Sequence, residues 1–122
     1  QELRSTAEYL AREPYVAADI QNGEKLAVRC RECHSLEAGG RHRIGPMLSG
    51  VFGRRAGKAP GFDYSSALAN ADFHWTPRAL DAWLASPYDF LPGNRMNFAG
   101  IDDAADRADL VAFLLTETGT EQ

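Results

Sequence analysis

The 122-residue sequence has little cysteine, no long apolar run and almost no strand-like alternation of apolar and polar residues. Its two cysteines lie in one short stretch, so structural disulfides do not explain them. No segment approaches the roughly 20 apolar residues that a membrane-spanning helix requires. The near absence of alternation predicts an all-α fold, and the length predicts one domain with a single core.

The charged residues are distributed unevenly, although the net charge is only −4: acidic residues are scarce in residues 23–60, and basic residues are scarce in residues 61–122. Residues 1–22 carry −2, residues 23–60 carry +5 and residues 61–122 carry −7. A basic segment beside an acidic C-terminal half predicts a dipolar molecule whose basic side can orient a docking partner. The acidic overall balance, with no aromatic residues interleaved among the bases, argues against nucleic-acid binding.

Both cysteines belong to the pentapeptide Cys30-Arg31-Glu32-Cys33-His34. Covalent attachment of haem c requires this pattern, because two thiols one turn apart reach the two vinyl groups while the adjacent imidazole reaches the iron. A zinc site would need a second ligand pair, which His42 and His74 do not supply. A redox dithiol would need a strand before it and a βαβ context after it. The pentapeptide therefore favours haem attachment, with a redox dithiol as the alternative.

Helical periodicity and capping residues predict the regular structure. Residues 1–13 form a short amphipathic helix closed by Pro14, and Asp19 caps a helix that runs into the pentapeptide. Gly23 and Ala27 give that helix a small-residue groove, in which the C-terminal helix is expected to cross it. Asp102, Asp103 and Asp106 mark the start of this C-terminal helix, and Gly119 stands at its C-cap. Two further helices are expected, capped by Thr76 and Ser65.

Long irregular segments separate these helices. Residues 35–61 and 86–101 are rich in glycine and proline and hold too little regular structure for so small a domain to be stable by helix packing alone. A large apolar cofactor at the centre of the core resolves this difficulty, so we expect the haem-free chain to be largely unfolded.

An electron-carrying iron needs a second axial ligand, for which the sequence offers Met47, Met96, His42 and His74. Met96 lies in a loop that follows a helix and is closed by Gly100. Such a loop can bring the Met96 thioether to the face of the iron opposite His34. Met47 follows His34 closely and suits a segment covering the histidine side, where a methionine commonly fills space.

The chain resembles the class I cytochromes c, the mitochondrial type and its bacterial short-chain relatives, over roughly residues 19–117. The resemblance rests on motifs in family order and spacing: the pentapeptide, the basic loop 39–46, the runs 48–54 and 59–64, Trp75, and the methionine loop ending at residue 101. It implies the class I cytochrome c fold, with helices and long loops wrapped around one covalently bound haem.

The resemblance also implies roles for individual residues. Cys30 and Cys33 bind the haem vinyls, and His34 and Met96 ligate the iron. The remaining cofactor-binding residues are the carbonyl of Pro46, which accepts a hydrogen bond from His34; the propionate partners Arg54, Tyr64 and Trp75; and Phe98 beside the exposed haem edge. Tyr88 and Asp89 stand where many relatives carry lysines, which puts the family's usual partner surface in question.

These features predict a soluble one-electron carrier with no substrate of its own, not an enzyme, which docks transiently at the haem edge with an oxidase, a quinol-oxidising complex or a dehydrogenase. A chain beginning at Gln1 fits the mature form of an exported precursor, and we expect a bacterial periplasmic location rather than the mitochondrial intermembrane space. Residues 1–18 form an extension (linker, anchor stub or docking arm) before a cytochrome domain over 19–122, and membrane anchoring upstream stays open. The alternatives are a dedicated electron-accepting subunit of one dehydrogenase and a ligand-binding or peroxidatic haem protein.

Overall fold

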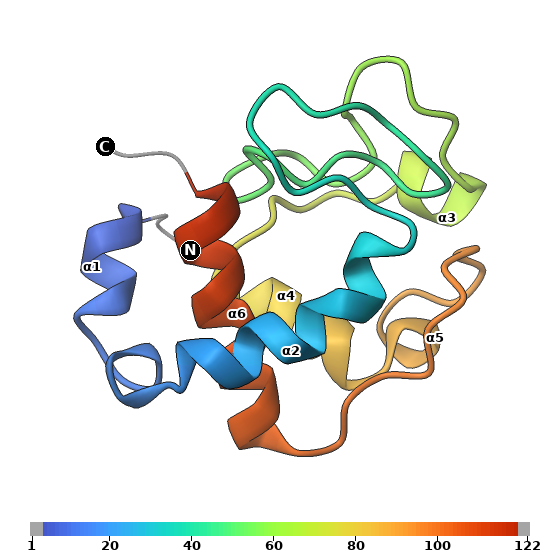
Figure 1. Cartoon of the computed structure of the whole chain (residues 1–122). Coiled ribbons are helices and arrows are strands. Elements are labelled where there is room, and N and C mark those ends of the chain that lie inside the picture. Colours follow the sequence, from blue (N-terminus) through green and yellow to red (C-terminus); the bar gives the residue numbers. More distant parts are fainter. Residues whose placement is uncertain (1–3, 120–122) are drawn as a thin grey trace.

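The computed structural model describes residues 4–119, and its regular structure is helical (Figure 1). The elements are α1 (Thr6–Leu10), the 3-10 helix η1 (Tyr15–Ala17), α2 (Ile20–Arg31), α3 (Ser66–Ala69), α4 (Pro77–Ala85), α5 (Pro87–Phe90) and α6 (Ala104–Thr118). Within residues 4–119, β pairing is limited to one bridge between Arg55 and His74. The predicted all-α class is confirmed. In the same range no helix is long and apolar enough to cross a membrane.

Side-chain caps fix where most of these helices begin. Asp19, Ser65 and Thr76 each accept a hydrogen bond from a backbone N–H in the first turn of α2, α3 and α4, as the sequence predicted. Asp103 does the same for α6, accepting from two backbone N–H groups. Each such cap satisfies a donor that the helix itself cannot pair and contributes about 1 kcal/mol.

Helices α2 and α6 cross at very close range and make the most extensive helix contact of the described chain. A Cβ added at Gly23 would lie 2.1 Å from the Asp109 carbonyl oxygen and 2.7 Å from Phe113 Cβ. Ala27, one turn later, is fully buried. The predicted small-residue groove is therefore where α6 lies. Asn22 fastens the crossing by donating to the carboxylates of Asp106 and Asp109, both at 2.9 Å.

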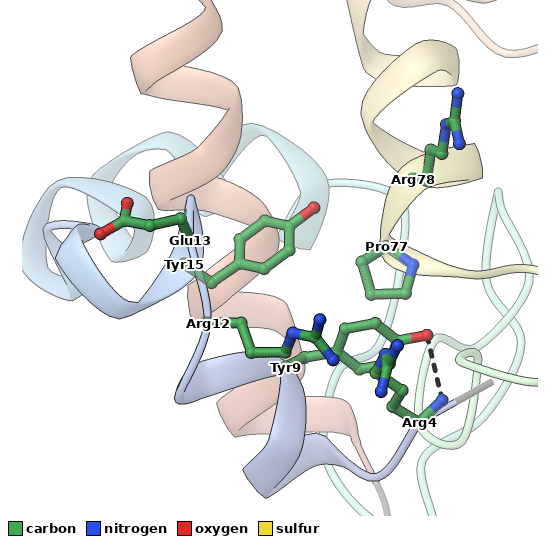
Figure 2. A pocket seen from close by; sticks show the side chains of 7 residues that line it. All are labelled: Arg4, Tyr9, Arg12, Glu13, Tyr15, Pro77 and Arg78. Atoms are coloured by element: carbon green, nitrogen blue, oxygen red, sulfur yellow. Dashed lines mark hydrogen bonds between the residues drawn. The ribbon is translucent and has the colours of Figure 1, made fainter. Parts of the chain in front are cut away.

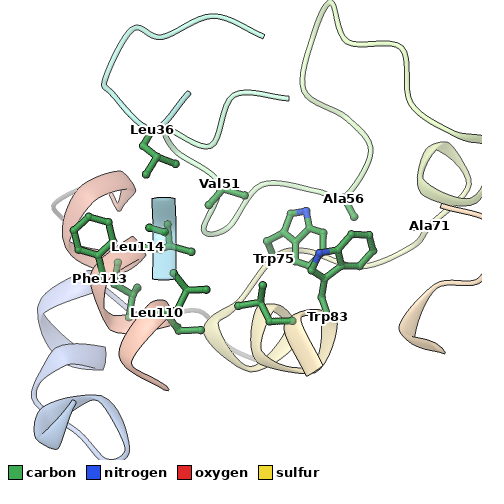
Figure 3. Packing of buried hydrophobic residues seen from close by; sticks show 13 residues of the cluster. Leu36, Val51, Ala56, Ala71, Trp75, Trp83, Leu110, Phe113 and Leu114 are labelled. Atoms are coloured by element: carbon green, nitrogen blue, oxygen red, sulfur yellow. The ribbon is translucent and has the colours of Figure 1, made fainter. Parts of the chain in front are cut away.

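The core continues from this crossing into an aromatic cluster under the long loops (Figure 3). Trp75 packs edge to face with Phe73 and Trp83, with ring centroids 4.9 and 5.5 Å apart, and Phe90 joins the same cluster. Leu36 and Val51, which belong to no helix, are also buried. The irregular segments thus contribute directly to the core.

The N-terminal segment packs against the rest of the chain, which its apolar periodicity alone did not predict. Helix α1 is shorter than the predicted 1–13, because a capping box between Ser5 and Glu8 begins it and it ends at Leu10, before the turn that leads to Pro14; residues 1–3 lie outside the described range. Both α1 and η1 pack against α6. Between this segment and the start of α4 lies a pocket of about 200 Å³, in which the Tyr15 hydroxyl points toward Pro77 and Arg78 (Figure 2).

Candidate haem-binding site

The pentapeptide stands at the C-terminal end of α2, where the helical turn continues past the last helical residue. The backbone N–H groups of Cys33 and His34 both donate to the Cys30 carbonyl, at 3.2 and 2.8 Å. Both thiols are free and partly buried, on one turn. Burial raises the pKa of the Cys30 thiol to about 11. A redox dithiol depends on a lowered thiol pKa, so this environment disfavours the dithiol alternative.

The loop after the pentapeptide holds the His34 ring in one orientation. His34 Nδ1 lies 2.6 Å from the Pro46 carbonyl oxygen and donates to it, which leaves the lone pair on Nε2. The Gly45 N–H donates to the Cys33 carbonyl at 2.8 Å, which returns this loop over the ring. A Cβ at Gly45 would lie 2.3 Å from His34 Cε1, so only glycine allows this approach. Burial lowers the pKa of His34 and favours the neutral imidazole that a metal ion requires.

Arg54, Tyr64 and Trp75, which lie far apart in the sequence, are brought together. The Trp75 backbone N–H donates to the Arg54 carbonyl at 2.9 Å, and Tyr64 lies near enough to the Arg54 guanidinium to influence its pKa. One guanidinium nitrogen of Arg54, Nη2, donates to the Met47 carbonyl at 2.9 Å. The other, Nη1, is buried and has no partner among the described residues.

A buried guanidinium nitrogen without a partner is costly unless an acceptor satisfies it. Burial also lowers the pKa of Arg54, which reflects the same cost of holding a charge away from water. A haem propionate is an anionic acceptor of the required kind. The free thiols, the glycine cradle over the imidazole and this unpaired cation together fit a covalently bound haem.

Met96 and Phe98 lie in the loop between α5 and α6, and both are partly buried against the core. The Arg29 guanidinium, one residue before Cys30, lies over the Phe98 ring at 5.5 Å from its centroid. This contact joins the methionine loop to the end of α2 that carries the pentapeptide.

Two residues have a role in the site region that sequence reasoning missed. His42, weighed there only as an iron ligand, joins two loops instead: its Nδ1 accepts from the Met47 N–H at 3.0 Å, and its Nε2 donates to the Pro60 carbonyl at 2.7 Å. Asn94 is buried beside Met96 and bonds the loop backbone. In the sequence, the signal for Asn94 was a polar side chain two residues before the candidate ligand Met96. Nothing local predicts the long-range hydrogen bond of His42.

An all-α fold, a turn that carries two thiols and an imidazole, a glycine packed against that imidazole, and a guanidinium with one buried, unsatisfied nitrogen define a c-type haem protein. Comparison with known proteins makes the family specific, because the family model described as cytochrome c matches residues 20–118. The chain belongs to the cytochrome c family. It is accordingly a monohaem cytochrome that binds one covalent haem c, and it is an electron carrier rather than an enzyme.

The chain is similar to both eukaryotic and bacterial members of the family. It is 44% identical over 103 residues to cytochrome c of Chlamydomonas reinhardtii, an alignment that covers 84% of this chain and 92% of that protein. It is 38% identical over 105 residues to cytochrome c2 of Rhodomicrobium vannielii, covering 86% and 84%. It is 41% identical over 102 residues to the cytochrome c-type cyt cy of Rhodobacter capsulatus, covering 83% of this chain and 50% of that protein.

Proposed function

We propose that this cytochrome carries single electrons between redox proteins with its iron held axially by His34 and Met96, and with the haem bound through Cys30 and Cys33. The observation that carries the His34 part is the 2.6 Å hydrogen bond from Nδ1 to the Pro46 carbonyl, which presents Nε2 as the ligand. When bound, the haem supplies an iron that accepts and releases one electron.

The chain's own residues make this transfer easy to reverse. With haem bound, His34 and Met96 would supply a neutral imidazole and a thioether to the iron, so no position would be left for a small-molecule ligand, and the soft thioether would favour the reduced form. Arg54, Tyr64 and Trp75 would compensate the propionate charge, and Phe98, which contacts Arg29, would lie beside the haem edge. Because little geometry changes on electron gain, the partner needs only to dock briefly.

We propose that the partners are redox proteins, such as an oxidase, a quinol-oxidising complex or a dehydrogenase, that meet the basic side of the molecule. Arg29, Arg41, Arg43 and Arg95 are all exposed, and such charges steer acidic partners during encounter. We further propose a periplasmic location for this chain. Cytochromes c2 of bacteria are among its relatives, which supports a bacterial setting.

The ligation is tested by the absorption spectrum of the oxidised holoprotein, which shows a thioether-to-iron charge-transfer band only when methionine binds the iron. We expect this band in the wild type and its complete loss in Met96→Ala. A redox titration of the same samples should show a lower reduction potential for the variant, because the thioether stabilises the ferrous form.

The matched control is Met47→Ala, which removes the other methionine of the chain. It should keep the band and a potential close to that of the wild type. A wild-type spectrum without the band, or a band that survives Met96→Ala, would contradict the proposed ligation and favour a ligand-binding haem protein instead.

A further inference from the structure

The backbone on both sides of the Met96 side chain is held by two side chains from the preceding segment. Tyr88, in α5, donates its hydroxyl to the Met96 carbonyl at 2.6 Å. Asn94 accepts the Met96 N–H on its side-chain oxygen at 2.9 Å. Both polar backbone groups of this one residue are therefore bonded to side chains.

Asn94 is itself anchored firmly. It is 7% exposed, and its side-chain nitrogen donates to the carbonyls of Pro87 and Leu91, both at 2.9 Å. Pro87 is the first residue of α5, and Leu91 directly follows the last residue of this helix. The three side-chain hydrogen bonds of Asn94 thus connect Met96 to both ends of this short helix, and Tyr88 connects Met96 to its first turn.

An external ligand that replaces Met96 needs room at the iron, and movement of the loop that carries Met96 provides this room. Such a movement separates the Met96 carbonyl from the Tyr88 hydroxyl and the Met96 N–H from the Asn94 amide. Those bonds therefore favour the closed loop over the open one, and an outside ligand that needs the open loop binds less tightly by the same factor.

We propose that Tyr88 and Asn94 are positioning residues that keep the thioether of Met96 on the iron and thereby exclude external ligands. This inference rests on the proposed His34 and Met96 ligation. It assigns Tyr88 to the site rather than to a docking surface.

The test is the affinity of the oxidised holoprotein for imidazole, followed by the change in its absorption spectrum. Tyr88 is 45% exposed, so Tyr88→Phe removes the hydroxyl without opening a cavity in the core. Loss of one hydrogen bond should raise the apparent association constant for imidazole by roughly 2- to 13-fold. The charge-transfer band should remain in the absence of imidazole.

Asn94→Ala provides a second variant, in which we expect a larger increase because three bonds are lost. Tyr9→Phe is the matched control, since the Tyr9 hydroxyl accepts the Arg4 N–H in the N-terminal segment, and its imidazole affinity should equal that of the wild type. The denaturant midpoint of every variant is measured in parallel. A purely structural role for Tyr88 would shift that midpoint and leave the imidazole affinity unchanged.

Equal imidazole affinity in the wild type and Tyr88→Phe, with the band present in both, would overturn this inference alone. An oxidised wild type without the band would instead overturn the ligation by Met96, and the role of Tyr88 with it.

Discussion

At the scale of single residues, burial rather than charge pairing sets the ionisation of the groups that matter. Burial is the first cause of the lowered pKa of His34 and Arg54 and of the raised pKa of Cys30. Each shift favours the neutral form of its group. For His34 the neutral form is the one that binds a metal ion, whereas Arg54 stays charged at neutral pH and is stabilised by an anion beside it.

Tyr15 shows the same effect at a site far from the haem. Burial, followed by the charge of Asp81, raises the pKa of its hydroxyl to about 12. An unfolded tyrosine ionises near pH 10, so between about pH 10 and 12 the unfolded state releases a proton that the folded state keeps. The contribution of Tyr15 to stability is therefore full below pH 10 and is lost as the pH rises toward 12.

We expect Tyr15→Phe to reduce this alkaline loss of stability. The measurement is the free energy of unfolding between pH 9 and 12 for both proteins, with the phenolate absorbance of Tyr15 taken from their difference spectrum so that haem absorbance cancels. Phenolate that appears in the folded protein with a midpoint near pH 10 would contradict the partial burial of Tyr15.

At the scale of elements, the crossing of α2 and α6 depends on one missing methyl group. Gly23→Ala places a Cβ 2.1 Å from a backbone oxygen of α6, which cannot rotate away as a side chain can. We expect the variant to lose about 1–3 kcal/mol of unfolding free energy, as overpacked cores do, despite the better helix propensity of alanine. Chemical denaturation of the holoprotein measures this loss.

The control on the same helix is Glu24→Ala, because Glu24 is exposed and adjacent to Gly23. Its unfolding free energy should stay within about 0.5 kcal/mol of the wild type. A Gly23→Ala protein as stable as this control would mean that the two helices do not approach as closely as described.

The starts of the helices can be predicted from the sequence, whereas the contacts of the long loops cannot. Caps such as Asp19 and Thr76 act within one turn, so the starts of α2 and α4 follow from local rules. The bonds of His42 to Pro60 and of Tyr88 to Met96 depend instead on the paths of long loops. Those paths are set by contacts between distant segments, and no local pattern encodes them.

The candidate site divides in the same way. The turn from Cys30 to His34 and the approach of Gly45 are short-range, and the sequence pattern carries them. The grouping of Arg54, Tyr64 and Trp75 was expected only through the family resemblance, since nothing in their spacing predicts it. The length of α1 was overestimated, because apolar periodicity continues past the point where its hydrogen bonding stops.

At the scale of the whole molecule, the proposed haem-binding residues lie in the long loops and at the end of α2. The N-terminal segment packs on α6 at one end of the molecule, while α3, α5 and the end of α2 that carries the thiols lie toward the other (Figure 1). Of the apolar side chains in residues 35–61, only Leu36, Val51 and two alanines are buried, and residues 91–101 have no fully buried apolar side chain. Much of the order of this half therefore rests on the cofactor and on the segments tied to it.

Removal of the cofactor is expected to unfold the chain largely. The proposed bonds of the haem to Cys30 and Cys33 and to Met96, and the proposed propionate contact with Arg54, would each hold a loop in place. Without them, the cost of ordering these loops would not be offset. The test uses Cys30→Ser, Cys33→Ser protein made without haem, compared with the holoprotein by circular dichroism during heating. A cooperative transition in the haem-free protein at a temperature close to that of the holoprotein would show that α2, α4 and α6 order the loops without it.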